Sequence, residues 1–239
     1  MKTVIVKDDK IAALFGAEGY VGEKLLQQLT EHGAYKKVLV FTQKPYRRME
    51  HSKMEPVLYK LDMIRGMKIV AEDLFICFDA SFFNTGGAHT IPSEWYKFIP
   101  QIAWEAHQNR VNQIALLSSH LAKPNALFFT NRVRGLIEES IRKIGFWGTH
   151  IFRPSFLLGE ELSSQWGEDL ADRIAQRIDR YTGGLIKKNR PVAASAVAEA
   201  MIMAVQSLQQ GVHIYSPEYL QEFSRKLLNK QIIKKKNAG

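Results

Sequence analysis

The chain has 239 residues, 46% of them hydrophobic, with a formal net charge of +9 and one cysteine, Cys77. This length and composition suit one α/β domain with a sizeable core, and a single cysteine excludes a disulfide framework and a cysteine-based zinc site. No apolar run approaches the roughly 20 residues that span a bilayer, and residues 1–10 do not read as a secretion signal. We therefore expect no membrane span and a cytoplasmic location.

The positive charge is concentrated at the carboxyl end. Residues 221–239 contain six lysines and arginines and one glutamate, so +5 of the net charge lies there and the rest is near balance. A terminal run of charge is usually a solvated helix end. Nucleic-acid binding is therefore not expected.

Short apolar runs alternate with amphipathic ones along the chain. The runs that predict buried strands are 11–15, 37–42, 56–61, 73–78, 112–119 and 149–154, and those with helical spacing are 22–33, 93–110 and 131–145. This alternation predicts a doubly wound parallel sheet with helices on both faces, an α/β fold.

The pattern changes after Pro154. It predicts helices over 169–184 and 194–208 and a strand over 211–217. We expect a single domain throughout. Its parts would be a dinucleotide-binding core at 10–154, a small substrate-side extension at 155–220 and a basic tail at 221–239.

A glycine-rich turn separates the first predicted strand from the first predicted helix. Gly16, Gly19 and Gly22 form G-x-x-G-x-x-G, with Tyr20 and Val21 at the start of the helix. Glycines let the backbone approach a pyrophosphate, whose charge the helix N-terminus then binds. The alternative is that the glycines serve only a tight turn and close helix packing.

The residues after the second strand indicate which dinucleotide binds. An NAD site usually has an acidic residue here for the ribose hydroxyl, but this chain has Thr42, Lys44, Arg47 and Arg48, and no carboxylate before Glu50. Hydroxyls and cations suit a 2′-phosphate. The pattern favours NADP over NAD, and the alternative is a solvated basic loop.

These features resemble the short-chain dehydrogenase/reductase superfamily, and within it the atypical NmrA-like and Tat-interacting-protein-like NAD(P)-binding branch. The segments that carry the resemblance are 15–33, 37–45, 112–129, 150–160 and 191–205. The resemblance implies a Rossmann fold, bound NADP(H), and Asp62 near the adenine. It also implies that Ser118 or Ser119 lies at the edge of the active site.

The proton-transfer residues of that superfamily are missing. Its members use a serine together with Tyr-x-x-x-Lys on the next helix. Matching Arg134 and Gly135 to the lysine and the small residue after it puts Thr130 in the tyrosine position. Arginine stays protonated and cannot shuttle a proton. The chain's one Tyr-x-x-x-Lys, Tyr20 to Lys24, lies in the glycine motif, on the wrong helix.

Asp79 is a second departure, because it stands where relatives usually have a glycine lining the cofactor groove. Its carboxylate would repel a pyrophosphate or would cap the next turn. His89 lies in a glycine-rich loop and is either a proton donor or a solvated loop residue. The histidines show no metal-ligand spacing, so no metal site is expected.

The sequence thus favours an NADP(H)-binding, reductase-like protein that acts on a carbonyl or sugar-type substrate. Ser118 or Ser119 would orient the carbonyl, Arg134 would hold the ribose or an oxyanion, and His89 or solvent would supply the proton. The competing hypothesis is a non-catalytic dinucleotide sensor or scaffold that acts through a protein partner. The missing tyrosine and lysine favour this second interpretation.

Overall fold

The computed structural model describes residues 9–78, 95–155, 157–158 and 191–237. In chain order the elements are β1 (Lys10–Phe15), α1 (Tyr20–Glu31), β2 (Tyr35–Thr42), β3 (Met54–Leu58), the 3-10 turn η1 (Leu61–Met63), β4 (Asp73–Ile76), α2 (Trp95–Gln108), β5 (Gln113–Leu117), α3 (Phe129–Ile144), β6 (Gly148–Phe152), β7 (Leu157–Leu158), β8 (Val192–Ala193), α6 (Ala194–Gln206), β9 (Gly211–Tyr215) and α7 (Pro217–Asn237). Most of the predicted strands and helices of the core lie within two or three residues of these bounds.

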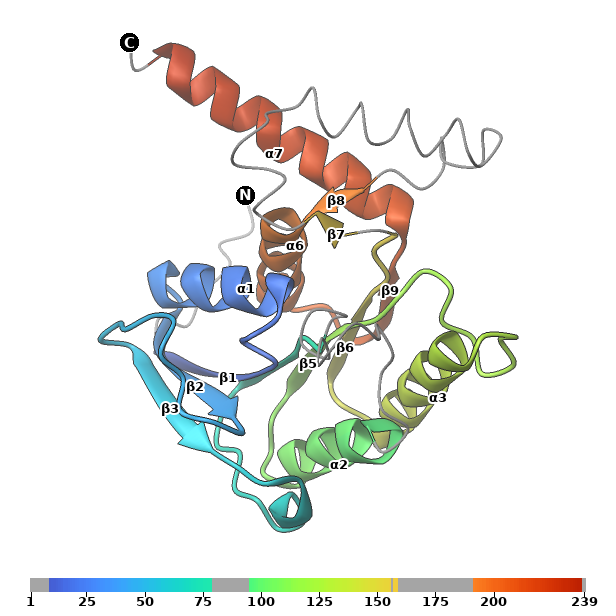
Figure 1. Cartoon of the computed structure of the whole chain (residues 1–239). Helices are drawn as coiled ribbons and strands as arrows, with labels where there is room; N and C mark the ends of the chain where they lie inside the picture. Colours follow the sequence, from blue (N-terminus) through green and yellow to red (C-terminus); the bar gives the residue numbers. More distant parts are fainter. Residues whose placement is uncertain (1–8, 79–94, 156, 159–190, 238–239) are drawn as a thin grey trace.

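Seven parallel strands form one sheet in the order β3-β2-β1-β4-β5-β6-β9 (Figure 1). The chain begins near the middle of the sheet, builds outward to β3, and then returns to β4 and builds outward to β9. Doubly wound sheets bind ligands where this direction reverses, at the carboxyl ends of the strands. The order is that of a Rossmann fold, so the predicted fold class is confirmed.

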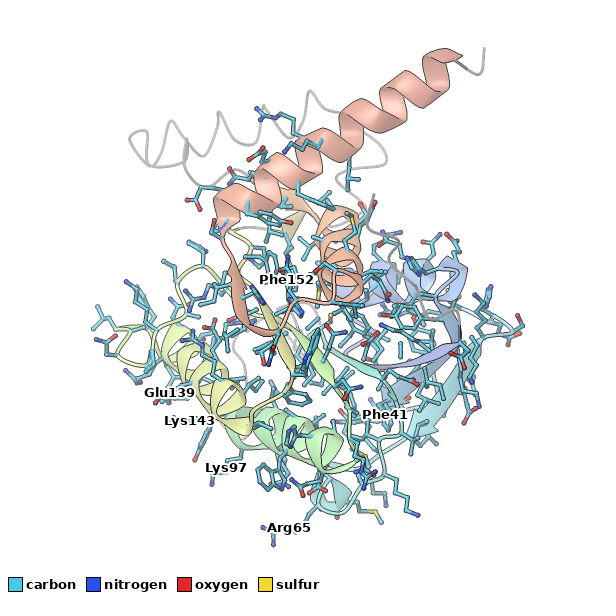
Figure 2. The ribbon with its side chains drawn as sticks, turned by 180° about the vertical axis from the view of Figure 1, so that it is seen from behind. Phe41, Arg65, Lys97, Glu139, Lys143 and Phe152 are labelled. Carbon is cyan, nitrogen blue, oxygen red and sulfur yellow. The ribbon has the colours of Figure 1, made fainter. Side chains whose placement is uncertain are left out.

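Helices cover both faces of the sheet. α1 and α6 lie on one face, and α2 and α3 on the other (Figure 1). Neighbouring residues of β1 point to opposite faces, so Leu14 packs toward α1 and Phe15 toward α2. Figure 2 labels one side chain from each layer, Phe152 beside α6 and Phe41 on the other face. Both faces of the sheet are buried, which explains why the strands are largely apolar and do not alternate with polar residues.

Residues 191–215 belong to the central layers. α6 packs along α1 through small side chains such as Ala196 and Ala200, and β9 pairs with β6 from Gly148↔Gly211 to Phe152↔Tyr215. β9 completes the sheet and α6 covers one of its faces, so residues 191–215 pack with the core. Residues 159–190, where a helix is predicted, lie outside the described part.

A buried polar network ties α6 to the amino end of the sheet. The Nζ of Lys10 donates to Asp73 Oδ2 at 3.1 Å, and the hydroxyl of Tyr35 donates to the same oxygen at 2.8 Å. Gln206, the last residue of α6, donates to the Tyr35 hydroxyl at 2.7 Å. Buried charges need such partners, so this network fixes α6 against β1, β2 and β4.

The last helix, α7, continues to residue 237, so the basic tail is helical. Leu220 is buried against the α1–α6 layer, and Phe223 and Leu227 are partly buried there. The carboxyl end of α7 extends beyond the rest of the molecule (Figure 1). In the described residues, no helix combines the length and apolarity needed to cross a bilayer.

Candidate dinucleotide-binding site

The glycine turn brings α1 directly onto the end of β1. Gly16 has φ +85°, and a Cβ there would lie 2.6 Å from the carbonyl oxygen of Cys77. A Cβ on Gly22 would lie 1.9 Å from the carbonyl oxygen of Gly16. Gly19 is the N-cap of α1 and gives the helix no side-chain cap. Because only glycine fits, the positive end of the α1 dipole faces the carboxyl ends of the strands without a side chain across it.

This geometry fits a dinucleotide. A pyrophosphate would be held by the backbone at Gly19, Tyr20, Val21 and Gly22, at the start of α1. Such a fit needs close backbone approach and a positive helix end, and both are present. A bound nicotinamide would supply a hydride donor or acceptor.

Two buried hydroxyl groups lie at and just after the end of β2. The Thr42 side chain is almost fully buried, and neither its hydroxyl nor that of Tyr46 has a hydrogen-bond partner among the described residues. Burial is the main cause that raises the pKa of Tyr46 to about 12. Lys44 and Arg47 follow the strand and are exposed. A buried hydroxyl is costly unless it is hydrogen-bonded, so this end of β2 is suited to a polar ligand.

Arg48 folds back over the glycine turn. Its Nη1 donates to the backbone oxygen of Glu18 at 2.8 Å and to Glu23 Oε2, in the first turn of α1, at 2.9 Å. The connection between β2 and β3 is therefore tied to the turn. Arg48 is already engaged with these two residues, whereas Arg47 next to it extends outward.

A hollow of about 450 Å³ lies beyond the ends of β2 and β3. Asp62 stands at its wall, in η1. The other lining residues are Gln43, Tyr59, Lys60, Leu61 and Phe98. A mixed aromatic and polar wall suits an adenine, and the position of Asp62 near an adenine stays a prediction.

The predicted catalytic region contains a buried ion pair. The hydroxyl of Ser118, at the end of β5, donates to Glu138 Oε1 at 2.5 Å. Arg153, after β6, binds the same carboxylate with Nε at 3.0 Å and Nη2 at 2.5 Å, and Arg142 adds a bond at 3.1 Å. Glu138 is 1% exposed. Because a hydroxyl has one proton, Ser118 can only accept hydrogen bonds from a ligand while this bond holds.

Arg134 lies one helical turn before Glu138 on α3. Together with Ser118 it lines a cavity of about 10 Å³ whose other walls are apolar, including Ile99 and Ile137. Such a space holds about one water molecule. Thr130, in the tyrosine position, is half-buried in the first turn of α3, and α3 contains no tyrosine. Ser119 is half-buried, and its Oγ accepts from Leu121 N at 3.4 Å.

Gly135 has a structural role. A Cβ there would lie 2.2 Å from the backbone carbon of Lys123, so the loop after β5 crosses α3 at this point. The Lys123 amide also donates to the Asn131 carbonyl at 3.2 Å. The pairing of arginine with a small residue at 134 and 135 thus reflects a close backbone crossing.

Sequence reasoning missed Glu18, Glu138 and Arg153, and it placed Arg48 among the basic residues after β2 without its bonds to Glu18 and Glu23. The available signal was weak, since a charged residue on a helix or in a loop is usually solvated. Arg153 did stand beside a proline at the end of a strand, inside a segment of the family resemblance. Asp79 and His89 lie outside the described residues. Within the described part, no cluster of three or more potential metal ligands occurs.

The chain has the Rossmann fold found in NAD-binding short-chain dehydrogenases and epimerases. WbmH from Bordetella bronchiseptica, solved with NAD+, is 15% identical with a TM-score of 0.58, over 87% of this chain and 75% of its own. MoeE5, solved with UDP-glucuronic acid and NAD, is 12% identical with a TM-score of 0.60, over 86% and 75%. The oxidoreductase ylbE from Lactococcus lactis is 13% identical with a TM-score of 0.58, over 92% and 97%.

Two yeast proteins are similar in sequence. Protein FMP52, mitochondrial, from Candida albicans is 26% identical over 208 residues, or 84% of this chain and 88% of its own length. Protein FMP52-1, mitochondrial, from Scheffersomyces stipitis is 26% identical over 229 residues, or 90% and 99%. No protein-family model matches the chain. The mitochondrial names contradict the cytoplasmic location expected above, which rested on an unremarkable amino terminus and a lone cysteine.

Proposed function

We propose that this chain binds a nicotinamide dinucleotide at the glycine turn, with NADP(H) preferred to NAD(H). The observation that carries the proposal is the close approach of Gly22 to Gly16, which seats the start of α1 on the end of β1, where its backbone N–H groups would bind a phosphate. The similar structures of WbmH and MoeE5, both solved with NAD, support a nicotinamide dinucleotide as the ligand.

The preference for NADP(H) rests on the end of β2. Lys44 and Arg47 are exposed there, and the buried Thr42 hydroxyl lacks a partner among the described residues. A 2′-phosphate is a strong acceptor that two cations and a hydroxyl would stabilise.

The test is a titration of the purified protein with NADPH and then NADH, followed by nicotinamide fluorescence. Gly19→Asp places a carboxylate at the helix N-cap, where aspartate stabilises a helix but repels a phosphate. We expect saturable NADPH binding that this variant loses. Gly33→Asp is the matched control, because a Cβ at Gly33 contacts nothing within 4 Å. Binding that survives Gly19→Asp, or that is absent from the wild type, would contradict the proposal.

The first candidate activity is reduction of a carbonyl or sugar-type substrate. MoeE5, solved with UDP-glucuronic acid and NAD, supports a sugar-type substrate by its fold. Arg134 would hold the nicotinamide ribose or a developing oxyanion, and Ser119 would orient the carbonyl. NADPH oxidation with a panel of aldehydes, ketones and nucleotide sugars tests this activity, with Arg134→Ala as the variant that should lose it.

The second candidate is a non-catalytic dinucleotide sensor. It is favoured by the commitment of the Ser118 proton to Glu138 and by Thr130 in place of a tyrosine. A sensor would bind NADPH without oxidising it against any substrate of the panel. It would also change its binding to a protein partner with cofactor occupancy.

The names of the two yeast relatives support a mitochondrial location. Imaging of the tagged chain against a mitochondrial marker tests this location.

A further inference from the structure

Glu18 occupies an unusual place for a carboxylate. It lies within the glycine turn, between Ala17 and Gly19, and it is half-buried. Its negative charge contributes to the raised pKa of both Tyr46 and Tyr59, which follow β2 and β3. Arg48, in the connection between β2 and β3, donates to the Glu18 backbone oxygen at 2.8 Å, so Glu18 lies beside that connection.

The carboxylate of Glu18 is incompletely paired. Its Oε2 is shut off from solvent and has no hydrogen-bond partner among the described residues. Burial raises the pKa of the carboxyl, and a hydrogen bond from the Glu18 backbone and the Arg48 charge offset this rise only in part. Arg48 donates a hydrogen bond to the Glu18 backbone oxygen, and its guanidinium forms an ion pair with the Glu23 carboxylate. Glu23 is thus paired with Arg48, whereas Glu18 Oε2 has no hydrogen-bond partner in the described part of the chain.

In Rossmann folds the adenosine ribose lies between the glycine turn and the end of the second strand, where an acidic residue normally accepts its 2′-hydroxyl. This chain has no acidic residue at the end of β2. We infer that Glu18, from the glycine turn, is the residue that accepts the ribose hydroxyl and opposes a 2′-phosphate. The inference rests on the proposed dinucleotide binding. The preference between NADPH and NADH then depends on two opposite effects. Lys44 and Arg47 favour the 2′-phosphate of NADPH, and the Glu18 carboxylate opposes it.

The variants Glu18→Gln and Glu18→Ala separate the effect of the Glu18 charge from the effect of its hydrogen-bond acceptor. Glutamine keeps a carbonyl acceptor without the charge, and alanine removes both. Because Arg48 donates to the backbone oxygen of Glu18, both variants keep this hydrogen bond over the turn. Glu139→Gln is the matched control. Glu139 is exposed on the outer side of α3, paired with Lys143 at 2.7 Å (Figure 2).

The experiment measures dissociation constants for NADPH and NADH by fluorescence at about pH 8, where carboxyls are ionised. In Glu18→Gln we expect NADPH to bind about tenfold more tightly and NADH to change less than about threefold. In Glu18→Ala we expect NADH to bind about tenfold more weakly. Glu139→Gln should leave both constants unchanged.

The outcomes distinguish this inference from the proposed function. Wild-type protein that binds neither dinucleotide overturns both. Wild-type protein that binds them, with constants that Glu18→Gln and Glu18→Ala leave unchanged, overturns the role of Glu18 alone. A shift of the same size in Glu139→Gln overturns it too, since the effect would then come from net charge.

Discussion

Ser118 and Glu138 are joined by a hydrogen bond of 2.5 Å in which the serine hydroxyl is the donor and the buried carboxylate the acceptor. The same carboxylate accepts two hydrogen bonds from Arg153, so the Glu138 side chain links α3 to β5 and to the end of β6. A serine in this position was expected to orient a carbonyl, which requires a donated proton. Here that proton is used within the protein, and Ser118 becomes a residue that positions α3.

Replacing Glu138 should destabilise the fold. Glu138→Gln removes the charge that compensates Arg153, whose side chain is largely buried. We expect a loss of about 3 kcal/mol in the free energy of unfolding, measured by urea denaturation. The neighbouring Glu139→Gln changes a solvent-accessible pair and should leave the free energy of unfolding nearly unchanged. Equal losses in the two variants would contradict a structural role for the buried pair.

Gly135→Ala should also be costly, for a steric reason. The added Cβ would lie 2.2 Å from the backbone carbon of Lys123 and 2.4 Å from the nitrogen of Pro124, and neither can yield without moving the loop. We expect a loss of about 2–3 kcal/mol in thermal or urea unfolding. Gly33→Ala, which meets open space, should be neutral or stabilising by up to about 1 kcal/mol. A neutral Gly135→Ala would show that the loop does not cross α3 so closely.

His150 predicts a loss of stability in mild acid. Burial, and secondarily the His213 ring stacked at 5.3 Å, lowers the pKa of His150 from 6.5 to about 4. The folded state therefore favours the neutral ring. The resulting stability is fully present above pH 6.5 and is lost as the pH falls toward 4.

The comparison that tests this is His150→Phe against the wild type, with urea unfolding followed across that pH range. The wild type should lose about 2 kcal/mol more than the variant on going to the acid end. The variant gives up the contact of His150 Nδ1 with the Tyr215 hydroxyl, 3.0 Å, at every pH. Parallel pH curves for the two proteins would exclude His150 as the source.

Lys44 and Arg47 should contribute to NADPH binding and not to NADH binding. The double variant Lys44→Ala/Arg47→Ala removes two exposed cations after β2. We expect NADPH to bind at least about tenfold more weakly, and the salt dependence of its binding to flatten. Lys143→Ala, on the outer side of α3 (Figure 2), controls for net charge. An equal loss for NADH would place these cations on the pyrophosphate instead.

The fold was predictable because the strands are buried on both faces. β1, β4 and β5 read as apolar runs after their first residue, and β6 is buried throughout although it contains Thr149 and His150. β3 was displaced, predicted at 56–61 and found at Met54–Leu58. Its bounds are set by its pairing with β2, from Val38↔Met54 to Thr42↔Leu58. This register cannot be read from the sequence of β3 alone.

The glycine turn was predictable for the same local reason, since its three glycines and the helix after them lie within one segment. The polar contacts of the site were not. Glu138 lies beside Ile137 on an amphipathic helix and resembles a surface residue, but its partners Ser118 and Arg153 come from two other elements. Arg48 and Glu23 are likewise separated by 25 residues. Such pairs depend on the crossing of elements in space.

The packing of α6 on α1 sets the order in which the molecule can be completed. Leu25, Leu26 and Leu29 lie in the first eighth of the chain, yet their cover is α6, which begins at Ala194. During synthesis on the ribosome, this leucine-rich face of α1 stays uncovered until α6 has emerged. β9 joins the sheet later still. A nascent chain of this protein therefore carries exposed apolar surface for most of its synthesis, which is the condition under which nascent chains are prone to aggregate.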